Sequence, residues 1–265
     1  MIRAIFFDID GTMVSYRNKI MSPKLRDDLM ALQQAGILIF VCSGRAPQDL
    51  KSTGMLRDVA FDGYVTVNGQ CCYNAQGVYR DNPVPREDLQ AALEVLETHE
   101  ELAALVEENG VSYLTSHNQR VDEVFEFLHT KQYPVMPAQR MVEHKVYQFI
   151  PLVNKEEEHL FVSVMPGCSY TRWHPLGIDV TAKGEGKADG IRATMAHYGL
   201  KPEETMAFGD GENDLTMLAL VGTAVAMGGT DERVKACAHY VTDTVEEEGI
   251  SKALRHFSLL PPERI

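Results

Sequence analysis

The chain has 265 residues, of which 45% are apolar, and a formal net charge of −13. These values are typical of a soluble globular protein with one large domain or two modest ones. The acidic balance argues against nucleic-acid phosphates or an anionic membrane surface as partners.

The chain shows no sign of a membrane or secreted protein. No apolar stretch is long enough to cross a bilayer, and Asp8 and Asp10 interrupt the first apolar run too early for a signal peptide. The five cysteines fit neither a disulfide framework nor a zinc site, so they are expected to be buried or inert thiols in a cytoplasmic protein. They are Cys42, Cys71, Cys72, Cys168 and Cys237.

Short apolar runs without strict alternation predict strands that are buried on both faces, as in a parallel sheet. Helical patterns lie between many of these runs, which indicates a βαβ architecture. The predicted strands are residues 4–7, 37–41, 64–67, 206–208, 224–227 and 240–241. The predicted helices are residues 24–36 with Ser22 as the N-cap, 187–199, 212–222, and 230–238 with Thr230 as the N-cap.

Residues 84–182 have a different pattern, which predicts a separate α+β module inserted into the parallel sheet. Its predicted helices are 85–101 and 120–130, and its predicted strands are 111–115 and 145–150, followed by a polar stretch and a segment that ends at 177–182 without an assigned structure. The turn-rich "YNAQGVYRDNPVP" before the module and "AKGEGK" after it are predicted to be hinges.

Polar residues follow four of the predicted core strands: Asp8, Ser43, Asn68 and Asp210. Because the carboxyl ends of parallel strands share one edge of the sheet, these side chains are expected to line a common crevice.

The stretch "DIDG" places Asp8 and Asp10 two residues apart, so near a strand end both can point to the same side of the sheet. Gly11 permits a sharp turn after them. Two carboxylates this close repel unless a hard cation such as Mg²⁺ lies between them. The alternative is a plain strand followed by an Asx turn.

The stretch "GDGENDLTML" offers further oxygen ligands after another strand. Asp210 could close a three-oxygen magnesium site with Asp8 and Asp10, and Asn213 could bind a substrate oxygen. Asp214 belongs to the same stretch, for which a helix N-cap with acidic residues in the first turn is the alternative.

A phosphoryl group could be held by the Ser43 hydroxyl and the amides of Gly44 and Arg45, although Ser43 is equally consistent with a plain N-cap. Lys187 begins a helix after a glycine-rich loop and could supply a cation. Lys183 is its rival, and a solvated surface lysine is the alternative for either.

Together, "FFDIDGT", "CSGR", "KGEGK" and "GDGENDLTML" resemble the haloacid dehalogenase superfamily of phosphohydrolases, and the C-terminal part resembles its Cof-like branch. The resemblance spans nearly the whole chain. It implies an α/β fold with a Rossmann-like parallel-sheet core, residues 1–83 and 184–265, and an inserted α+β cap domain, residues 84–183, that selects the substrate. The third motif, "GEGKA", departs from the "GVSKG" pattern that is frequent in this branch.

The resemblance also implies a mechanism. Asp8 would be the nucleophile that forms an aspartyl phosphate, and Asp10 would be the general acid and then the general base. Lys187 would stabilise the nucleophile and the phosphoryl charge. The phosphoryl oxygens would be held by Ser43, Gly44 and the backbone amide of Ile9, with Asn213 close by and Asp214 supporting the site. The Mg²⁺ ligands would be Asp8, the carbonyl of Asp10, and Asp210.

The expected activity is therefore Mg²⁺-dependent hydrolysis of small phosphomonoesters, most simply sugar phosphates, by a cytoplasmic monomer or homodimer. Two alternatives use the same residues: a sugar phosphomutase, and a non-enzymatic phospho-accepting module similar to a response-regulator receiver. Candidate contacts to the leaving group in the cap are Asn118, Arg140, His144, Arg172, Trp173 and His174. Trp173 could equally anchor the core of the cap.

Overall fold

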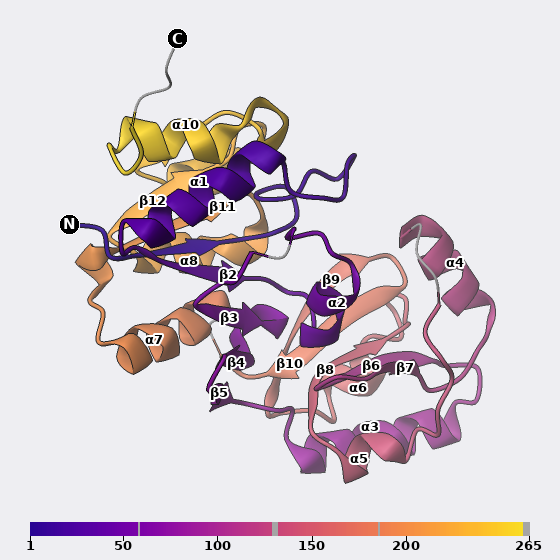
Figure 1. Cartoon of the computed structure of the whole chain (residues 1–265). Coiled ribbons are helices and arrows are strands. Elements are labelled where there is room, and N and C mark those ends of the chain that lie inside the picture. Colours follow the sequence, from indigo (N-terminus) through magenta and orange to yellow (C-terminus); the bar gives the residue numbers. More distant parts are fainter. Residues whose placement is uncertain (58, 129–131, 185, 262–265) are drawn as a thin grey trace. The chain divides into compact units, whose positions relative to one another are not determined.

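The structure is a computed structural model that describes residues 1–57, 59–128, 132–184 and 186–261. The chain divides into two compact units, here named unit 1 and unit 2. Unit 1 comprises Met1–Arg45, Asp49–Asp81 and Glu185–Ile265, and unit 2 comprises Ala46–Gln48 and Asn82–Gly184. Figure 1 shows both units and labels many of their helices and strands.

Unit 1 is built on an eight-stranded sheet of order β13-β12-β11-β1-β2-β3-β4-β5. The strands from β13 to β3 run parallel to their neighbours, and each overlaps a predicted apolar run. These strands are β1 (Ala4–Phe7), β2 (Leu38–Cys42), β3 (Gly63–Thr66), β11 (Thr205–Gly209), β12 (Thr223–Ala226) and β13 (Tyr240–Val241). The predicted Rossmann-like α/β fold is confirmed.

The sheet continues at its far edge with two antiparallel strands, β4 (Cys71–Asn74) and β5 (Gly77–Asp81). The sequence predicted a turn-rich hinge over residues 73–85, and this is wrong for the part that forms the hairpin. Every described residue of β5 is at least partly exposed, so the strand lacks the apolar run that marked the buried strands.

Helices cover both faces of this sheet (Figure 1). On one face, α1 (Pro23–Gln34) and α10 (Gly249–His256) contribute buried residues to one hydrophobic cluster. On the other face, α7 (Lys187–Tyr198), α8 (Leu215–Leu220) and α9 (Glu232–Ala236) contribute to a second cluster. Unit 1 also contains 3-10 segments at Val67–Gly69, Pro202–Glu204, Glu212–Asp214 and Val245–Glu247. Helix α2 (Pro47–Ser52) is divided, with its first two residues in unit 2 and the rest in unit 1.

Two of the predicted helix caps have different outcomes. Ser22 caps α1 as predicted, with its hydroxyl accepting from the amide of Leu25. The prediction that Thr230 caps α9 is wrong, because Asp231 is the N-cap and its carboxylate accepts from the amide of Arg233. The Thr230 hydroxyl instead donates to a backbone carbonyl at the candidate site described below.

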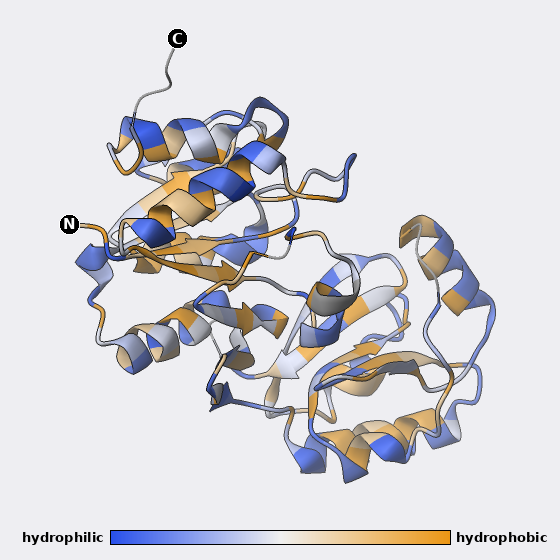
Figure 2. Cartoon of the chain, in the orientation of Figure 1, coloured by the Kyte–Doolittle hydropathy of each residue, from blue (hydrophilic) through white to orange (hydrophobic). Residues whose placement is uncertain are grey.

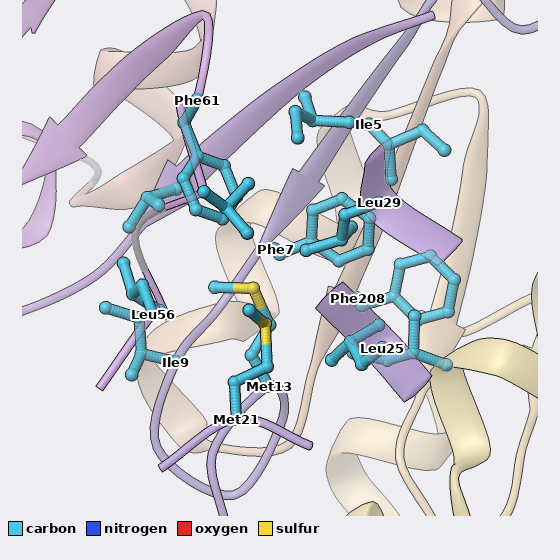
Figure 3. Packing of buried hydrophobic residues seen from close by; sticks show 14 of the residues in the cluster. Ile5, Phe7, Ile9, Met13, Met21, Leu25, Leu29, Leu56, Phe61 and Phe208 are labelled. Carbon is cyan, nitrogen blue, oxygen red and sulfur yellow. The ribbon is translucent and has the colours of Figure 1, made fainter. Parts of the chain in front are cut away.

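The centre of unit 1 is apolar because the strands are buried on both faces (Figure 2). Phe7 of β1 and Phe208 of β11 stack with ring centroids 5.2 Å apart, and Leu25 and Leu29 of α1 belong to the same cluster (Figure 3). Burying one such side chain stabilises the fold by about 1.5–3 kcal/mol. This packing fixes the strands whose ends carry the polar residues.

Unit 2 is a five-stranded sheet of order β7-β6-β8-β10-β9, antiparallel at every pairing. Its strands are β6 (Ala104–Glu108), β7 (Ser112–Leu114), β8 (Val146–Pro151), β9 (Cys168–His174) and β10 (Gly177–Ala182). Its helices are α3 (Arg86–Thr98), α4 (Gln119–Leu128), α5 (Arg140–Glu143) and α6 (His159–Val162). The last residues of the predicted helix 120–130 lie outside the described residues.

Within unit 2, α3, α5 and α6 share one hydrophobic cluster with the sheet, and α4 shares another. Strands β6, β9 and β10 were not predicted as strands: β6 ends in two glutamates, and β9 is largely exposed. The assignment of unit 2 as a cap domain is a proposal, developed below.

Two expectations from composition concern the whole chain. Among the described residues, no helix has the length and apolarity that crossing a membrane requires. Four of the five cysteines are buried, as expected, whereas Cys237 is exposed.

Candidate active site

The carboxyl ends of three neighbouring strands bring the predicted polar residues to one edge of the sheet in unit 1. Asp8 follows β1 directly, Ser43 follows β2, and Asp210 follows β11. Parallel pairing sets this register: the amide of Asp8 donates to the Phe208 carbonyl (3.0 Å), and the amide of Ser43 donates to the Val65 carbonyl (2.8 Å).

Lys187 joins this edge as the first residue of α7. Its Nζ lies 2.5 Å from Oδ1 of Asp8 and 2.6 Å from Oδ1 of Asp214, and its side chain is completely buried. The structure therefore brings Lys187 to Asp8, while Lys183 is an exposed residue of unit 2.

The charges of this trio determine each other's ionisation. Burial opposes the charged form of Lys187, but the neighbouring Asp214 and Asp8 more than offset it, so the pKa of Lys187 is raised. Burial raises the pKa of Asp8, Lys187 lowers it, and Asp214 and Asp210 add to the increase, which leaves the pKa well above its ordinary value. One buried lysine is thus shared by several carboxyl groups.

Asp214 has a second role at the 3-10 segment Glu212–Asp214, directly before α8. Its Oδ2 accepts hydrogen bonds from the amides of Asp210 and Gly211, each 2.9 Å long. Both interpretations of this residue therefore apply, because it caps a helical segment with one oxygen and binds Lys187 with the other.

Asp210 is held in place by two threonines and a glycine. Its Oδ1 accepts from the Thr12 hydroxyl at 2.9 Å, and its carbonyl accepts from the Thr230 hydroxyl. Gly11 has φ +86°, and a Cβ at this position would lie 2.1 Å from Oδ2 of Asp210. The glycine of "DIDG" is thus required both by the turn and by the closeness of the Asp210 carboxyl group.

Carboxylate oxygens of Asp8, Asp210 and Asp214 lie within 4.8 Å of one another. Burial raises the pKa of Asp210 to about 6; the hydrogen bond from Thr12 opposes this increase, and the charge of Asp214 adds to it. Acidic groups forced together in this way, with only hard oxygen donors, fit a divalent cation such as Mg²⁺. Asp214 receives protein donors on both oxygens, whereas the donors to Asp8 and Asp210 are on Oδ1, so Asp8 and Asp210 are the better candidates for metal ligands.

The carboxylate of Asp10 points to a different partner. Its two oxygens accept from Nε and Nη2 of Arg45, both at 2.7 Å. The backbone carbonyl of Asp10 accepts from the Tyr16 hydroxyl at 3.2 Å. Only this carbonyl, and not the carboxylate, remains a candidate metal ligand, as the family resemblance implies.

Ser43 and Gly44 form a tight loop whose partner is Asn68. The Ser43 hydroxyl oxygen accepts from the amide of Arg45 (3.1 Å), and α2 begins only at Pro47, so Ser43 is not the N-cap of that helix. The Ser43 carbonyl accepts a hydrogen bond from the backbone amide of Asn68 (3.0 Å). A Cβ on Gly44 would lie 3.2 Å from the side-chain oxygen Oδ1 of Asn68.

Asn213 reaches the same loop, since its Nδ2 donates to Oδ1 of Asn68 at 3.3 Å. Val67, Asn68 and Gly69 all have positive φ (49°, 50° and 92°), which is strained for a β-branched residue. The sequence placed Asn68 at the sheet edge but assigned it no role. Ile9 is buried beneath the site, and its predicted use of a backbone amide stays a prediction.

The roles of Arg45, Thr12, Tyr16 and Thr230 side chains were also missed. Arg45 and Thr12 belong to the motifs "CSGR" and "DIDGT". These motifs indicated that both residues lie near the site, but not which side chains they contact. Tyr16 carried no pattern, and Thr230 was interpreted as a cap.

The cap candidates lie in unit 2. The guanidinium of Arg140 contacts Glu108 at 2.6 Å, and that of Arg172 contacts Glu158 at 2.9 Å. Asn118 donates to the Glu101 carbonyl and caps α4. His144 is partly exposed, as its side chain retains 46% of its accessible surface. Trp173 is 37% exposed and packs against Gly177, so it does not anchor the core of the unit, and His174 lies beside it.

The fold and the site define a class of protein: an α/β enzyme with a carboxylate–lysine–carboxylate cluster at the carboxyl edge of its parallel strands. Residues 5–254 match the family model of the haloacid dehalogenase-like hydrolases. The chain belongs to this family, and it is a phosphoric monoester hydrolase.

Individual relatives match over almost the full chain. The Bacillus subtilis protein YkrA, which carries a provisional name as a phosphatase, is 31% identical over 97% of this chain and 98% of its own. The sugar phosphatase BT4131, of subclass IIB, has a TM-score of 0.80 and 35% identity, covering 97% of this chain and 100% of its own. The phosphatase BT1666 from Bacteroides thetaiotaomicron has a TM-score of 0.88 and 33% identity, covering 98% and 96%.

Proposed function

We propose that this protein hydrolyses sugar phosphates and related small phosphomonoesters with Mg²⁺, through an aspartyl phosphate on Asp8. The observation that carries the proposal is the buried Lys187, which holds the carboxylate of Asp8 at the end of the central strand. A nucleophilic carboxylate has to approach a phosphoryl group that is itself negative, and a fixed cation beside it reduces their repulsion.

In the first step, an oxygen of Asp8 forms a bond to phosphorus, and the bond from phosphorus to the leaving-group oxygen breaks. Asp10 gives a proton to that oxygen, so the alcohol departs neutral. The Ser43 hydroxyl and the amide of Gly44 hold the phosphoryl oxygens, and Asn213 lies close to them.

In the second step, Asp10 takes a proton from a water molecule whose oxygen attacks the phosphorus of the aspartyl phosphate. The bond between Asp8 and phosphorus breaks, inorganic phosphate leaves, and Asp8 returns to its carboxylate form, which Lys187 stabilises. Each proton that Asp10 gives in the first step is thus recovered in the second.

Mg²⁺ would be held by Asp8, the Asp10 carbonyl and Asp210, where it would neutralise phosphoryl charge. The donor set and the raised pKa values of Asp8 and Asp210 support this assignment. Thr12 and Thr230 would orient Asp210 toward the ion.

We further propose that residues 1–83 and 184–265 form the catalytic domain and that residues 84–183 are the cap that selects the leaving group. The similarity to BT4131, a sugar phosphatase, supports sugar phosphates as the substrate class. Trp173 and His174 supply an exposed aromatic and imidazole surface in unit 2 that suits a sugar ring.

The test is phosphate release from a panel of sugar phosphates, with Mg²⁺ and after chelation of metal. We expect turnover that requires Mg²⁺ and that disappears in the Asp8→Asn variant, whose fold is retained. Free sugar with inorganic phosphate is the expected product, whereas an isomeric sugar phosphate would identify a phosphomutase. A folded protein that releases phosphate from none of these esters, or an Asp8→Asn variant that remains active, would contradict the proposal.

A further inference from the structure

Arg45 makes the best-defined side-chain contact of the candidate site that the proposed mechanism does not use. Its Nε lies 2.7 Å from Oδ2 of Asp10, and its Nη2 lies 2.7 Å from Oδ1, so the guanidinium grips the carboxylate with two parallel hydrogen bonds. This forked geometry fixes the plane of a carboxylate, which a single contact does not do.

The backbone of Arg45 is itself anchored on both sides of the residue. Its amide donates to the Ser43 hydroxyl (3.1 Å), and its carbonyl accepts from the amide of Val67 (3.1 Å). The guanidinium of Arg45 therefore extends from the same loop that is proposed to hold the phosphoryl group. The backbone of Arg45 is fixed by that loop, so the guanidinium can set the orientation of the Asp10 carboxylate relative to the phosphoryl group.

Stability alone is a weak reason for this ion pair. The side chains of Arg45 and Asp10 each keep 35% of their accessible surface, and ion pairs with this exposure contribute little to the free energy of unfolding. The pair leaves capacity for chemistry, because a carboxylate has about four lone-pair sites and the fork occupies only two of them.

We propose that Arg45 is a positioning residue that orients the Asp10 carboxyl group toward the leaving-group oxygen and then toward the attacking water. This inference rests on the proposed function and adds a residue to it. Arg45 exchanges no proton itself: the proton passes from Asp10 to the departing alcohol in the first step and from water to Asp10 in the second.

The two steps respond differently when Asp10 is badly oriented. An alkyl leaving group needs a proton as its bond to phosphorus breaks, whereas p-nitrophenolate departs readily without one. Loss of Arg45 should therefore slow phosphorylation of Asp8 by a sugar phosphate far more than phosphorylation by p-nitrophenyl phosphate. Hydrolysis of the aspartyl phosphate needs Asp10 as a base and should slow with both substrates.

The experiment compares Arg45→Ala and Arg45→Lys with Asp10→Asn and with a matched control, Arg255→Ala. Arg255 forms a similar fork with Asp28, at 3.0 and 2.9 Å, between α10 and α1 of the same unit. The substrates are p-nitrophenyl phosphate and the sugar phosphate that the unaltered protein cleaves fastest. Rapid quenching measures p-nitrophenol release, and circular dichroism verifies that every variant is folded.

For Arg45→Ala we expect kcat on the sugar phosphate to fall about 100-fold, as for other small misplacements of a catalytic group, with KM changed by less than about threefold. With p-nitrophenyl phosphate we expect a burst of product, because the second step becomes limiting. Arg45→Lys should recover only part of the rate, since an ammonium cannot form the fork. The double variant with Asp10→Asn should be no slower than Asp10→Asn alone, and Arg255→Ala should have the kcat and KM of the unaltered protein.

An increase in KM at unchanged kcat would show that Arg45 binds substrate and does not position Asp10, which overturns the inference. Equal slowing of both substrates without a burst, or kinetics matching those of Arg255→Ala, would overturn it as well. These results leave the proposed function intact, provided that Asp8→Asn is inactive. An unaltered protein without phosphatase activity removes both proposals together.

Discussion

Replacing Lys187 by methionine should cost unit 1 much of its stability. The Lys187 ammonium is completely buried and lies 2.5 and 2.6 Å from Asp8 and Asp214, so methionine fills similar space but leaves two buried carboxyl groups without their cation. Removing one partner of a buried ion pair typically costs about 3–5 kcal/mol. This is a large share of the roughly 5–15 kcal/mol that holds a typical protein folded.

Lys252→Met is the matched control. Lys252 contacts Asp243 at 2.5 Å, but both side chains keep 52% of their accessible surface. An exposed pair of this kind contributes about 0–1 kcal/mol. The same substitution should therefore cost about 2–5 kcal/mol more at Lys187 than at Lys252, because the Lys187 ammonium is buried and contacts two carboxyl groups.

The measurement has to report on unit 1 separately. The single tryptophan, Trp173, lies in unit 2, so its fluorescence follows that unit and serves as an internal reference. Hydrogen exchange of the β1 and β11 amides under increasing urea gives the free energy of opening unit 1. The loss should shrink at low pH, because the pKa of Asp8 is raised and its protonated form needs no cation.

Equal losses for Lys187→Met and Lys252→Met would refute this reasoning. A second variant distinguishes charge imbalance from poor packing. If the unpaired carboxylates cause the loss, Lys187→Met combined with Asp214→Asn should be more stable than Lys187→Met alone. A further decrease would show that the methionine packs badly and that the charge argument is wrong.

The buried strands were the part of the fold that sequence could predict. Strand β1 and strand β11 are apolar on both faces because helices cover both sides of the sheet, and such runs stand out without any knowledge of topology. The polar residue that follows each run then marks the shared edge. This is why Asp8 and Asp210 could be assigned to one site although they lie 202 positions apart in the sequence.

Half-exposed antiparallel strands were the part that sequence could not predict. Strand β9 (Cys168–His174) is mostly exposed, and "YTRWHPLG" was interpreted as a ligand-binding stretch; in the structure, the tyrosine to the histidine are strand residues. Strand β5 was assigned to a hinge for the same reason. In both strands, polar residues face solvent from the exposed side of the sheet. A sequence rich in polar residues is also typical of loops, so it does not identify a strand.

Side-chain partners inside the site were equally beyond the sequence. Arg45 was considered for its amide alone, because nothing in "CSGR" indicates that its guanidinium reaches Asp10, 35 residues earlier. The interpretations of Asp214 as a cap and as a site residue competed in the sequence, yet its two oxygens perform one role each. Spacing identifies which residues gather at an edge, whereas the donors and acceptors that pair there depend on rotamers.

Two further predictions test the local geometry of unit 1. Gly11→Ala and Gly36→Ala both force alanine into positive φ, at a cost of about 1–2 kcal/mol, but only at Gly11 does the new Cβ meet Asp210. Mg²⁺ should therefore raise the thermal midpoint of Gly36→Ala and not that of Gly11→Ala, and an equal rise in both would contradict the proposed metal site. Arg255→Ala should lose about 1.5–3 kcal/mol near pH 7, because the fork to Asp28 is a partly buried, charged hydrogen-bond pair. Burial raises the pKa of Asp28. The hydrogen bonds that Asp28 accepts, above all from Arg255, lower the pKa by more than burial raises it, so the net shift is downward. A carboxyl group with a depressed pKa contributes stability above its unfolded pKa, and this contribution disappears as the pH falls through the folded value. The difference in unfolding free energy between Arg255→Ala and the unaltered protein should thus be constant above about pH 5 and should decrease as the pH falls through the depressed pKa of Asp28; a difference that does not decrease in acid would mean that Arg255 acts through packing and not through its charge.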